Sequence, residues 1–251
     1  MMPMERRDSI YVNGVFIREL KNRFLCEVKI DGKVEECYVP SSCHLSNFLH
    51  LKGKRVLLVP TQGKNPRTRY ALYAAPYRRN YIVLNTSLSN VVIEKGIHNR
   101  RFSYLGKRSF VQKEHSVEGY KADLYIPQTK TIVEIKSVLS EKDEAVFPTV
   151  FSERTQNQLK SIQEMLDKGY NVAFIIVSLN PYIKKLTIDK STQFYSELTR
   201  CIEKGMEIRA YTSHLKDYEI EIKKQIPLLY LYNGEKKKHD RSSSRPYLAG
   251  R

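Results

Sequence analysis

The chain has 251 residues, of which 43 are Lys or Arg and 27 are Asp or Glu, so its formal net charge is +16 with His neutral. A chain of this length can bury a full hydrophobic core. The composition, 41% hydrophobic and 28% charged, excludes a disordered or fibrous protein. We expect no membrane span and no signal peptide, because the sequence lacks the long apolar runs that both need. The positive excess predicts a polyanionic partner.

The number and spacing of the cysteines exclude two further classes of protein, disulfide scaffolds and zinc ribbons. Cys26, Cys37, Cys43 and Cys201 form no C-x-x-C pair, so they are too few for a disulfide scaffold and wrongly spaced for a zinc ribbon. We therefore expect a cytoplasmic protein without a membrane partner.

The first 85 residues are expected to form a small β-barrel domain. Asp31-Gly32 is a strong hairpin signal between two runs with alternating apolar positions. The strands are predicted at Val15–Leu20, Phe24–Ile30, Lys33–Val39, Arg55–Thr61 and Thr68–Ala75. Five short strands in about 70 residues suit an oligonucleotide-binding (OB) barrel. Periodicity alone leaves an SH3-like barrel as the alternative.

A strongly basic segment lies within this domain. From Cys37 to Ile93 there is no Asp or Glu, and aromatic residues such as Tyr70 are interleaved with the cations. This mixture predicts contact with single-stranded nucleic acid, where cations meet phosphates and rings stack on bases. The alternative is an ordinary barrel surface, because tyrosines are common in strands and Lys and Arg on edges. The cations are Lys52, Lys54, Arg55, Lys64, Arg67, Arg69, Arg78 and Arg79.

Residues 86–232 are predicted to form an α/β domain with a mixed sheet, because strands and helices alternate after a hairpin. A linking helix is expected from Thr86, its N-cap, to Lys95, with Gly96 just past its end. Residues 233–251 are predicted to be a basic disordered tail. The expected strands are Tyr81–Asn85, Tyr120–Tyr125, Thr131–Ser137, Tyr170–Leu179 and Met206–Tyr211, and the expected helices are Ser152–Lys168, capped by Ser152, and Asp189–Lys204.

Three residues of the predicted hairpin carry the strongest chemical signal. Glu134 and Lys136 share one face of a strand, and hairpin pairing would place Asp123 near Glu134. Paired carboxylates suit Mg²⁺ or Mn²⁺ and a lysine can orient water, which together predict phosphodiester hydrolysis. Glu114 could add a carboxylate. The alternative is a surface strand with an ordinary Glu–Lys pair, although charges that interrupt an apolar run are costly there.

The next predicted helix begins with Glu153 and Arg154. Arg154 and Gln158 are four residues apart and share a helix face, which could point at the same cluster and touch nucleic acid. The alternative is a first-turn Glu favoured by the helix dipole beside a solvated Arg.

These residues also resemble a known family, SfsA (sugar fermentation stimulation), over roughly residues 15–225. The resemblance is carried by KNRFLCEVKIDGK, NPRTRYALYAAP, YIVLNTSLSN, VEIKSV, VFPTVFSERTQNQL and GMEIRAY, and by the spacing from Glu114 to Asp123. The chain departs from the family pattern at Tyr120-Lys121, where the family has Ser-Arg, and at Ser41-Ser42-Cys43, Thr149 and Thr155.

The resemblance implies an OB-like barrel followed by a nuclease domain of the PD-(D/E)xK type. It implies that Asp123 and Glu134 hold Mg²⁺ or Mn²⁺ and that Lys136 positions the attacking water. Glu114 would be an accessory carboxylate, and Glu153 and Arg154 would be partners on the following helix, with Glu153 in an accessory role. Independently of the resemblance, Lys121, Arg154 and Gln158 are expected to contact nucleic acid.

Three functions remain open from the sequence. The first is a metal-dependent DNA or RNA nuclease, and the second is a nucleic-acid-binding protein on a silent nuclease fold. The third is a carbohydrate- or protein-binding barrel, because OB barrels also bind oligosaccharides. A homodimer is also left open.

Overall fold

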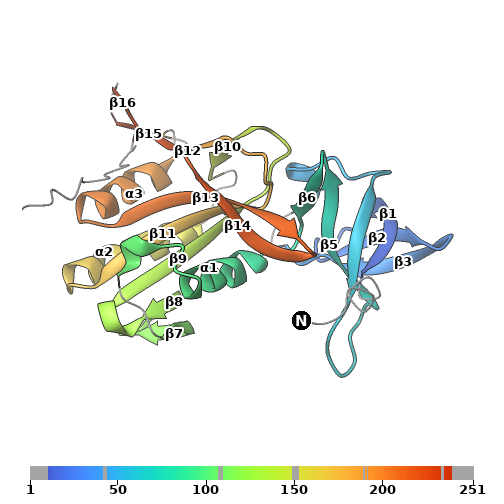
Figure 1. Cartoon of the computed structure of the whole chain (residues 1–251), viewed down its shortest axis with the longest axis horizontal. Helices are drawn as coiled ribbons and strands as arrows, with labels where there is room; N and C mark the ends of the chain where they lie inside the picture. The colour runs from blue at the N-terminus through green and yellow to red at the C-terminus, as the bar shows by residue number, and fades with distance from the viewer. Residues whose placement is uncertain are drawn as a thin grey trace, which may run out of the picture.

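The structure is a computed structural model that describes residues 11–41, 44–106, 110–148, 153–188, 190, 192–232 and 235–238. Two groups of elements lie side by side along the long axis, with the N-terminal strands at one end (Figure 1). Within the described residues, no helix combines the length and apolar character needed to span a bilayer.

The N-terminal group is a closed five-stranded barrel. Its strands are β1 (Val12–Glu19), β2 (Leu25–Ile30), β3 (Lys33–Tyr38), β4 (Arg55–Pro60) and β5 (Tyr70–Tyr77). Antiparallel neighbours run in the order β3-β2-β1-β4-β5, and parallel pairing of β3 with β5 closes the ring. The Asp31-Gly32 turn joins β2 to β3 as predicted, with positive φ at both residues. Gly14 allows β1 to pack closely against the Val28 side chain of β2, because a Cβ at this position would lie 2.4 Å from it.

The rest of the chain is built on a mixed six-stranded sheet in the order β14-β13-β11-β9-β8-β7. Strands β9, β11 and β13 are parallel, and the remaining neighbours are antiparallel. A smaller sheet has the order β10-β12-β15-β16. The strands are β7 (Gln112–Val117), β8 (Tyr120–Ile126), β9 (Thr131–Val138), β10 (Glu144–Phe147), β11 (Asn171–Ser178), β12 (Lys185–Ile188), β13 (Glu207–Lys216), β14 (Glu219–Ile226), β15 (Leu228–Tyr232) and β16 (Glu235–Lys238).

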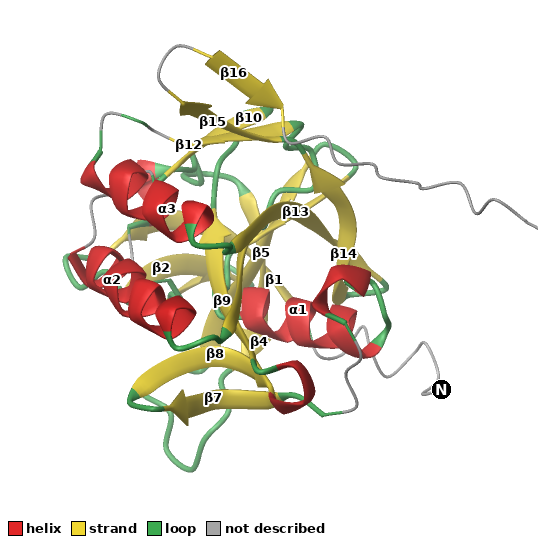
Figure 2. Cartoon of the chain, turned by 90° about the vertical axis from the view of Figure 1, so that its left-hand side faces the viewer, coloured by secondary structure: helices red, strands yellow, loops and turns green. Residues whose placement is uncertain are grey.

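Helices cover both faces of the six-stranded sheet (Figure 2). Helix α1 (Leu88–His98) lies on one face, and α2 (Glu153–Asp167) and α3 (Gln193–Glu203) lie together on the other. Two hydrophobic cores result. The α1 face continues without a break into the barrel core, whereas α2 and α3 pack with the second core. The prediction of a mixed α/β domain after a barrel is confirmed.

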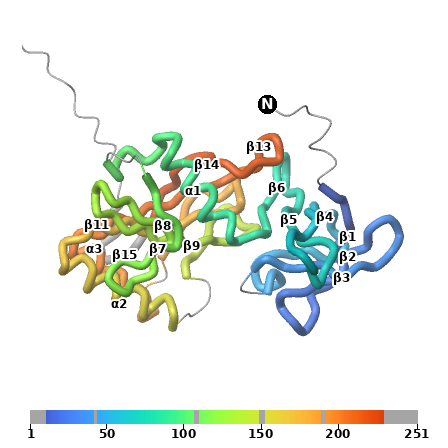
Figure 3. Tube along the Cα trace, turned by 90° about the horizontal axis from the view of Figure 1, so that it is seen from below, coloured from blue at the N-terminus to red at the C-terminus, as the bar shows by residue number. Residues whose placement is uncertain are grey.

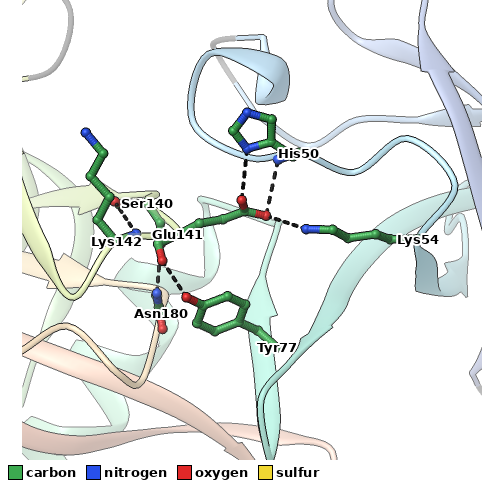
Figure 4. Close-up of polar contacts among 7 residues, drawn as sticks. All are labelled: His50, Lys54, Tyr77, Ser140, Glu141, Lys142 and Asn180. Carbon is green, nitrogen blue, oxygen red and sulfur yellow. Dashed lines mark hydrogen bonds and ion pairs between the residues drawn. The ribbon is translucent and has the colours of Figure 1, made fainter.

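The barrel is joined to the second domain by backbone and side-chain contacts. Strand β6 (Asn80–Val83) extends the barrel sheet and leads directly into α1 (Figure 3). The Val83 N–H donates to the Leu179 carbonyl at 3.1 Å, so β6 also contacts the other sheet. Glu141 accepts hydrogen bonds from Lys54 Nζ at 2.8 Å and from the His50 N–H at 3.1 Å, and Tyr77 donates to its carbonyl at 2.5 Å (Figure 4).

Several local predictions need correction. Thr86 does not cap α1, because its hydroxyl bonds to the Pro40 carbonyl, and the helix begins at Leu88. Gly96 lies inside the helix, where a Cβ would approach the Phe102 ring to 2.6 Å, so packing rather than termination explains this glycine. Ser152, the expected cap of α2, and Thr149 lie outside the described residues, as do 239–251 of the expected tail. Glu235–Lys238, also placed in that tail, pair with β15.

Candidate active site

Asp123 lies where two neighbouring strands separate. Strands β8 and β9 pair only through the positions from Leu124↔Val133 to Ile126↔Thr131. Asp123 is the first residue beyond this ladder, and its Oδ2 accepts the Ile135 N–H at 2.8 Å. Its side chain therefore satisfies a backbone donor that a strand partner would otherwise take. Asn90 of α1 donates to Oδ1 at 3.3 Å, which holds the carboxylate from the other side.

Glu134 is a buried carboxylate with a donor on each oxygen. Its side chain is 1% exposed. Oε1 accepts Lys136 Nζ at 2.6 Å and Gln158 Nε2 at 2.9 Å, and Oε2 accepts the Tyr120 hydroxyl at 2.7 Å. Lys136 Nζ also donates to Gln158 Oε1 at 2.7 Å. The predicted sharing of one face by Glu134 and Lys136 is confirmed, and α2 reaches the same cluster through Gln158.

The two carboxylates affect each other. Burial, and then the negative charge of Glu134, raise the pKa of Asp123 above its usual value. The Ile135 N–H, Lys136 and Asn90 oppose this shift without cancelling it. The Glu134 part of this shift reflects repulsion between the two carboxylates, which a bound cation would offset.

An open cleft of about 780 Å³ lies beside this cluster, between the β7–β8 hairpin and α2. It is lined by five carboxylates and three cations, so its wall is net negative. Asp123, Tyr120 and Gln158 form its side next to Glu134, and the charged lining residues are Glu114, Glu118, Asp123, Glu153, Glu164, Lys121, Arg154 and Lys168.

The accessory residues predicted from the sequence reach this cleft but not the buried cluster. Glu114 and Lys121 form an exposed ion pair at 2.5 Å across the β7–β8 hairpin. Glu114 has φ of 44°, a left-handed conformation that is uncommon for a side chain of this size and often marks functional sites. Glu153 and Arg154 are exposed on the first turn of α2 and also line the cleft.

The cations predicted on the barrel are all exposed, but three of them have carboxylate partners. Lys54 pairs with Glu141, and Arg78 pairs with Asp143 at 2.6 Å, so both connect the barrel to the second domain. Arg67 lies 3.7 Å from Glu36. Within the described residues, the cations that form no ion pair with a carboxylate are Lys52, Arg55, Lys64, Arg69 and Arg79.

Tyr70 does not lie where a base-stacking ring would be needed. Its side chain is buried in the barrel core, and the Arg69 guanidinium lies 5.1 Å above the ring. This position contradicts the expectation that Tyr70 stacks on bases, because an inward-facing strand position cannot present its ring to a ligand. The alternating pattern of β5 should have revealed this, since Leu72 and Ala74 share its face.

The described part of the chain contains no cluster of three or more His, Cys, Asp or Glu side chains arranged to hold a metal. The Asp123–Glu134 pair still fits Mg²⁺ or Mn²⁺, because these ions commonly use one or two protein carboxylates and complete their shell with water and phosphate. The observation that supports this fit is the position of Asp123, a carboxylate that lines the open cleft next to Glu134.

Comparison with known protein families identifies the family of this chain. Residues 19–84 match the family described as the SfsA N-terminal OB domain, and residues 87–219 match the one described as the sugar fermentation stimulation protein RE domain. The chain belongs to the SfsA family. The resemblance inferred from the sequence is thereby confirmed, and the N-terminal barrel is an OB domain rather than an SH3-like one.

Relatives in this family match nearly the whole chain. A sugar fermentation stimulation protein homolog of Caldanaerobacter subterraneus subsp. tengcongensis is 30% identical over 227 residues, covering 87% of this chain and 96% of that protein. Another from Desulforamulus reducens is 26% identical over 222 residues, covering 86% and 92%. The solved structure of Pyrococcus furiosus SfsA in complex with Ca²⁺ has a TM-score of 0.76, 23% identity and coverage of 88% and 96%, which shows a shared fold.

Two contributors to the cluster were not predicted. The sequence marks Tyr120 as a departure from the family pattern but gives it no role, and nothing singles out Asn90. In the sequence, Tyr120 is recognisable only as an aromatic residue three positions before Asp123. A tyrosine of the hydrophobic core would look the same.

Proposed function

We propose that this member of the SfsA family is a divalent-metal-dependent nuclease that hydrolyses phosphodiester bonds of DNA or RNA, with a second domain of the PD-(D/E)xK type. The observation that carries the proposal is the contiguous set of Asp123, Glu134 and Lys136 beside an open cleft. Two carboxylates and one lysine are the groups that metal-assisted hydrolysis of a phosphodiester requires.

Asp123 and Glu134 would hold the cation. When bound, Mg²⁺ or Mn²⁺ supplies Lewis acidity toward a phosphate oxygen and offsets the charge that develops on the phosphorus centre. The solved Pyrococcus furiosus relative was obtained in complex with Ca²⁺, which supports a cation site in the family.

Lys136 would orient the attacking water. Its Nζ is held between Glu134 Oε1 and Gln158 Oε1, and one of the three ammonium donors is left for a further acceptor. The lysine side chain is 19% exposed, so the ammonium is close to solvent although its partner is buried. Gln158 fixes this geometry because it bonds to both members of the ion pair.

The cations would bind the nucleic acid. Arg154 and Lys121 line the cleft, where they can contact phosphates near the reacting one. The exposed cations of the barrel would supply further phosphate contacts outside the net-negative cleft. The OB domain supports nucleic acid as the partner, because such barrels bind oligonucleotides.

A second function, nucleic-acid binding without cleavage, is favoured by one observation. Both oxygens of Glu134 already accept hydrogen bonds within the protein, so the carboxylate is satisfied without a cation. In this alternative the Asp123–Glu134–Lys136 cluster is a structural remnant and the barrel carries the activity.

Cleavage of labelled single- and double-stranded DNA and RNA tests the proposal. The assay compares Mg²⁺, Mn²⁺ and EDTA, using the wild type, Glu134→Ala and the control Lys185→Met, an exposed lysine on β12. We expect cleavage with metal, none in EDTA, and loss only in Glu134→Ala. Equal cleavage by the wild type and Glu134→Ala would overturn it. Salt-dependent binding without metal-dependent cleavage would support the second function instead.

A further inference from the structure

The side of the cleft next to Glu134 is formed by the residues that bond to it. Tyr120 and Gln158 line the cleft, whereas Glu134 and Lys136 do not. A Glu134 side chain that is 1% exposed therefore has no direct surface on the cleft, and a solute in the cleft meets the Tyr120 and Gln158 side chains first.

The two oxygens of Glu134 differ in their partners. Oε1 is shared by Lys136 and Gln158, which belong to the ion-pair network. Oε2 is bonded by the Tyr120 hydroxyl at 2.7 Å, a short distance typical of a hydrogen bond to a charged acceptor. Because Tyr120 lines the cleft and Glu134 does not, a cation that reaches Oε2 from the cleft must displace the hydroxyl that covers it, while the Lys136 contact on Oε1 can remain.

Tyr120 is suited to act as a permanent donor. Its ring is packed in the second core with Leu159 and Met165 of α2, which restricts where the hydroxyl can go. The phenol carries a single hydroxyl proton, and it is the donor in the bond to Glu134 Oε2.

We propose that Tyr120 is a positioning residue that closes the cleft over Glu134, its hydroxyl occupying Oε2 in competition with a divalent cation. The inference rests on the proposed function, because it assumes that Glu134 is a metal ligand. Cation binding then requires the tyrosine hydroxyl to leave the carboxylate, which weakens the intrinsic affinity of the site. Removing the hydroxyl should tighten divalent cation binding about tenfold, the effect expected of one hydrogen bond to a charged group.

The test is calorimetric titration of the full chain with MnCl₂, without nucleic acid. The variants are Tyr120→Phe, the matched control Tyr125→Phe on the same strand, and Asp123→Asn in both backgrounds. We expect about tenfold tighter binding by Tyr120→Phe, wild-type affinity in Tyr125→Phe, and loss of binding with Asp123→Asn. Equal or weaker binding by Tyr120→Phe overturns the inference.

A second measurement keeps the test independent of the stability of the phenylalanine variant. Tyrosines labelled with ¹³C at Cζ report on hydroxyl hydrogen bonding, and the Tyr120 signal is assigned by its disappearance in Tyr120→Phe or by residue-specific labelling. Saturating Mg²⁺ should shift this signal in the wild type as the hydroxyl leaves Oε2. An unchanged signal at saturation overturns the inference.

The outcomes separate this inference from the proposed function. Unchanged affinity in Tyr120→Phe, combined with metal-dependent cleavage by the wild type, overturns the inference and supports the nuclease. Tighter binding without any cleavage supports the inference and overturns the nuclease. Absence of Mn²⁺ binding in both proteins overturns both.

Discussion

Replacement of Lys136 tests how the buried charge of Glu134, beside the cleft, is compensated. Among the ion pairs of the described residues, Lys136 is the cation that contacts Glu134, whose side chain is 1% exposed. Lys136→Met keeps most of the apolar stem but leaves that carboxylate with only the neutral donors Tyr120 and Gln158. Removing one member of a buried pair typically costs about 3–5 kcal/mol, and the partial exposure of the lysine favours a value of about 3 kcal/mol.

A double-mutant cycle with Glu134→Gln isolates the interaction. Glu134→Gln alone should cost about 1 kcal/mol, because the Lys136 ammonium keeps partial access to water and its bond to Gln158. The double variant should cost about 2 kcal/mol instead of the additive value of about 4 kcal/mol, giving a coupling energy of about 2 kcal/mol. Urea unfolding followed by circular dichroism measures each free energy, with Lys185→Met, in an exposed pair with Glu144, expected to change by under about 0.5 kcal/mol. Additive single effects, or a Lys136→Met cost as small as that of Lys185→Met, would refute the reasoning.

Three further predictions follow from the same geometry. Asp123→Asn should raise the free energy of unfolding at pH 7, because burial and the Glu134 charge raise the pKa of Asp123. The favourable contribution of the protonated Asp123 side chain is therefore present at low pH and is lost as the pH rises through the folded-state pKa. Thermal unfolding measured across a pH series should show that the stability gain of Asp123→Asn shrinks toward acid pH, and a gain that is uniform with pH would contradict this. Although burial opposes it, hydrogen bonds from Lys54 and His50 lower the pKa of Glu141, so Glu141→Gln should cost about 1 kcal/mol at pH 7. The difference should vanish as the pH falls through that lowered pKa, because the wild-type carboxylate is then protonated in turn. Lys64→Ala should reduce the slope of log K against log salt for single-stranded DNA by about 0.7 in fluorescence anisotropy, whereas Lys204→Ala, whose ammonium pairs with Asp167, should leave it unchanged.

The sequence pattern was sufficient for those parts of the fold in which local signals agree with the tertiary structure. The dipeptide Asp31-Gly32 predicts the hairpin turn that joins β2 to β3. The near-continuous apolar run Asn171–Ser178 is typical of a strand covered on both faces. The pair Glu134 and Lys136 follows from the two-residue period of a strand alone. Their proximity to Asp123 required only the assumption that a hairpin joins β8 to β9.

Features that depend on contacts between distant segments could not be predicted in this way. Gly96 has the sequence signature of a helix end, but its absent side chain makes room for Phe102. Lys54 and Arg78 look like any exposed cation until Glu141 and Asp143 are seen opposite them. The bond from Tyr120 to Glu134 likewise depends on the separation of β8 from β9, which no residue type reports by itself.

The apolar core that continues from the barrel into the α1 face has a consequence for the length of the fragments that the proposed nuclease would produce. Because packed side chains and the Glu141 contacts join the two domains, the barrel cannot swing freely, and the distance from its surface to the cleft is set by the fold. Under the proposed function, a strand held by the barrel would be cut at a constant distance from the held segment. The enzyme would then act as a molecular ruler, and its limit digest would contain fragments of one minimum length.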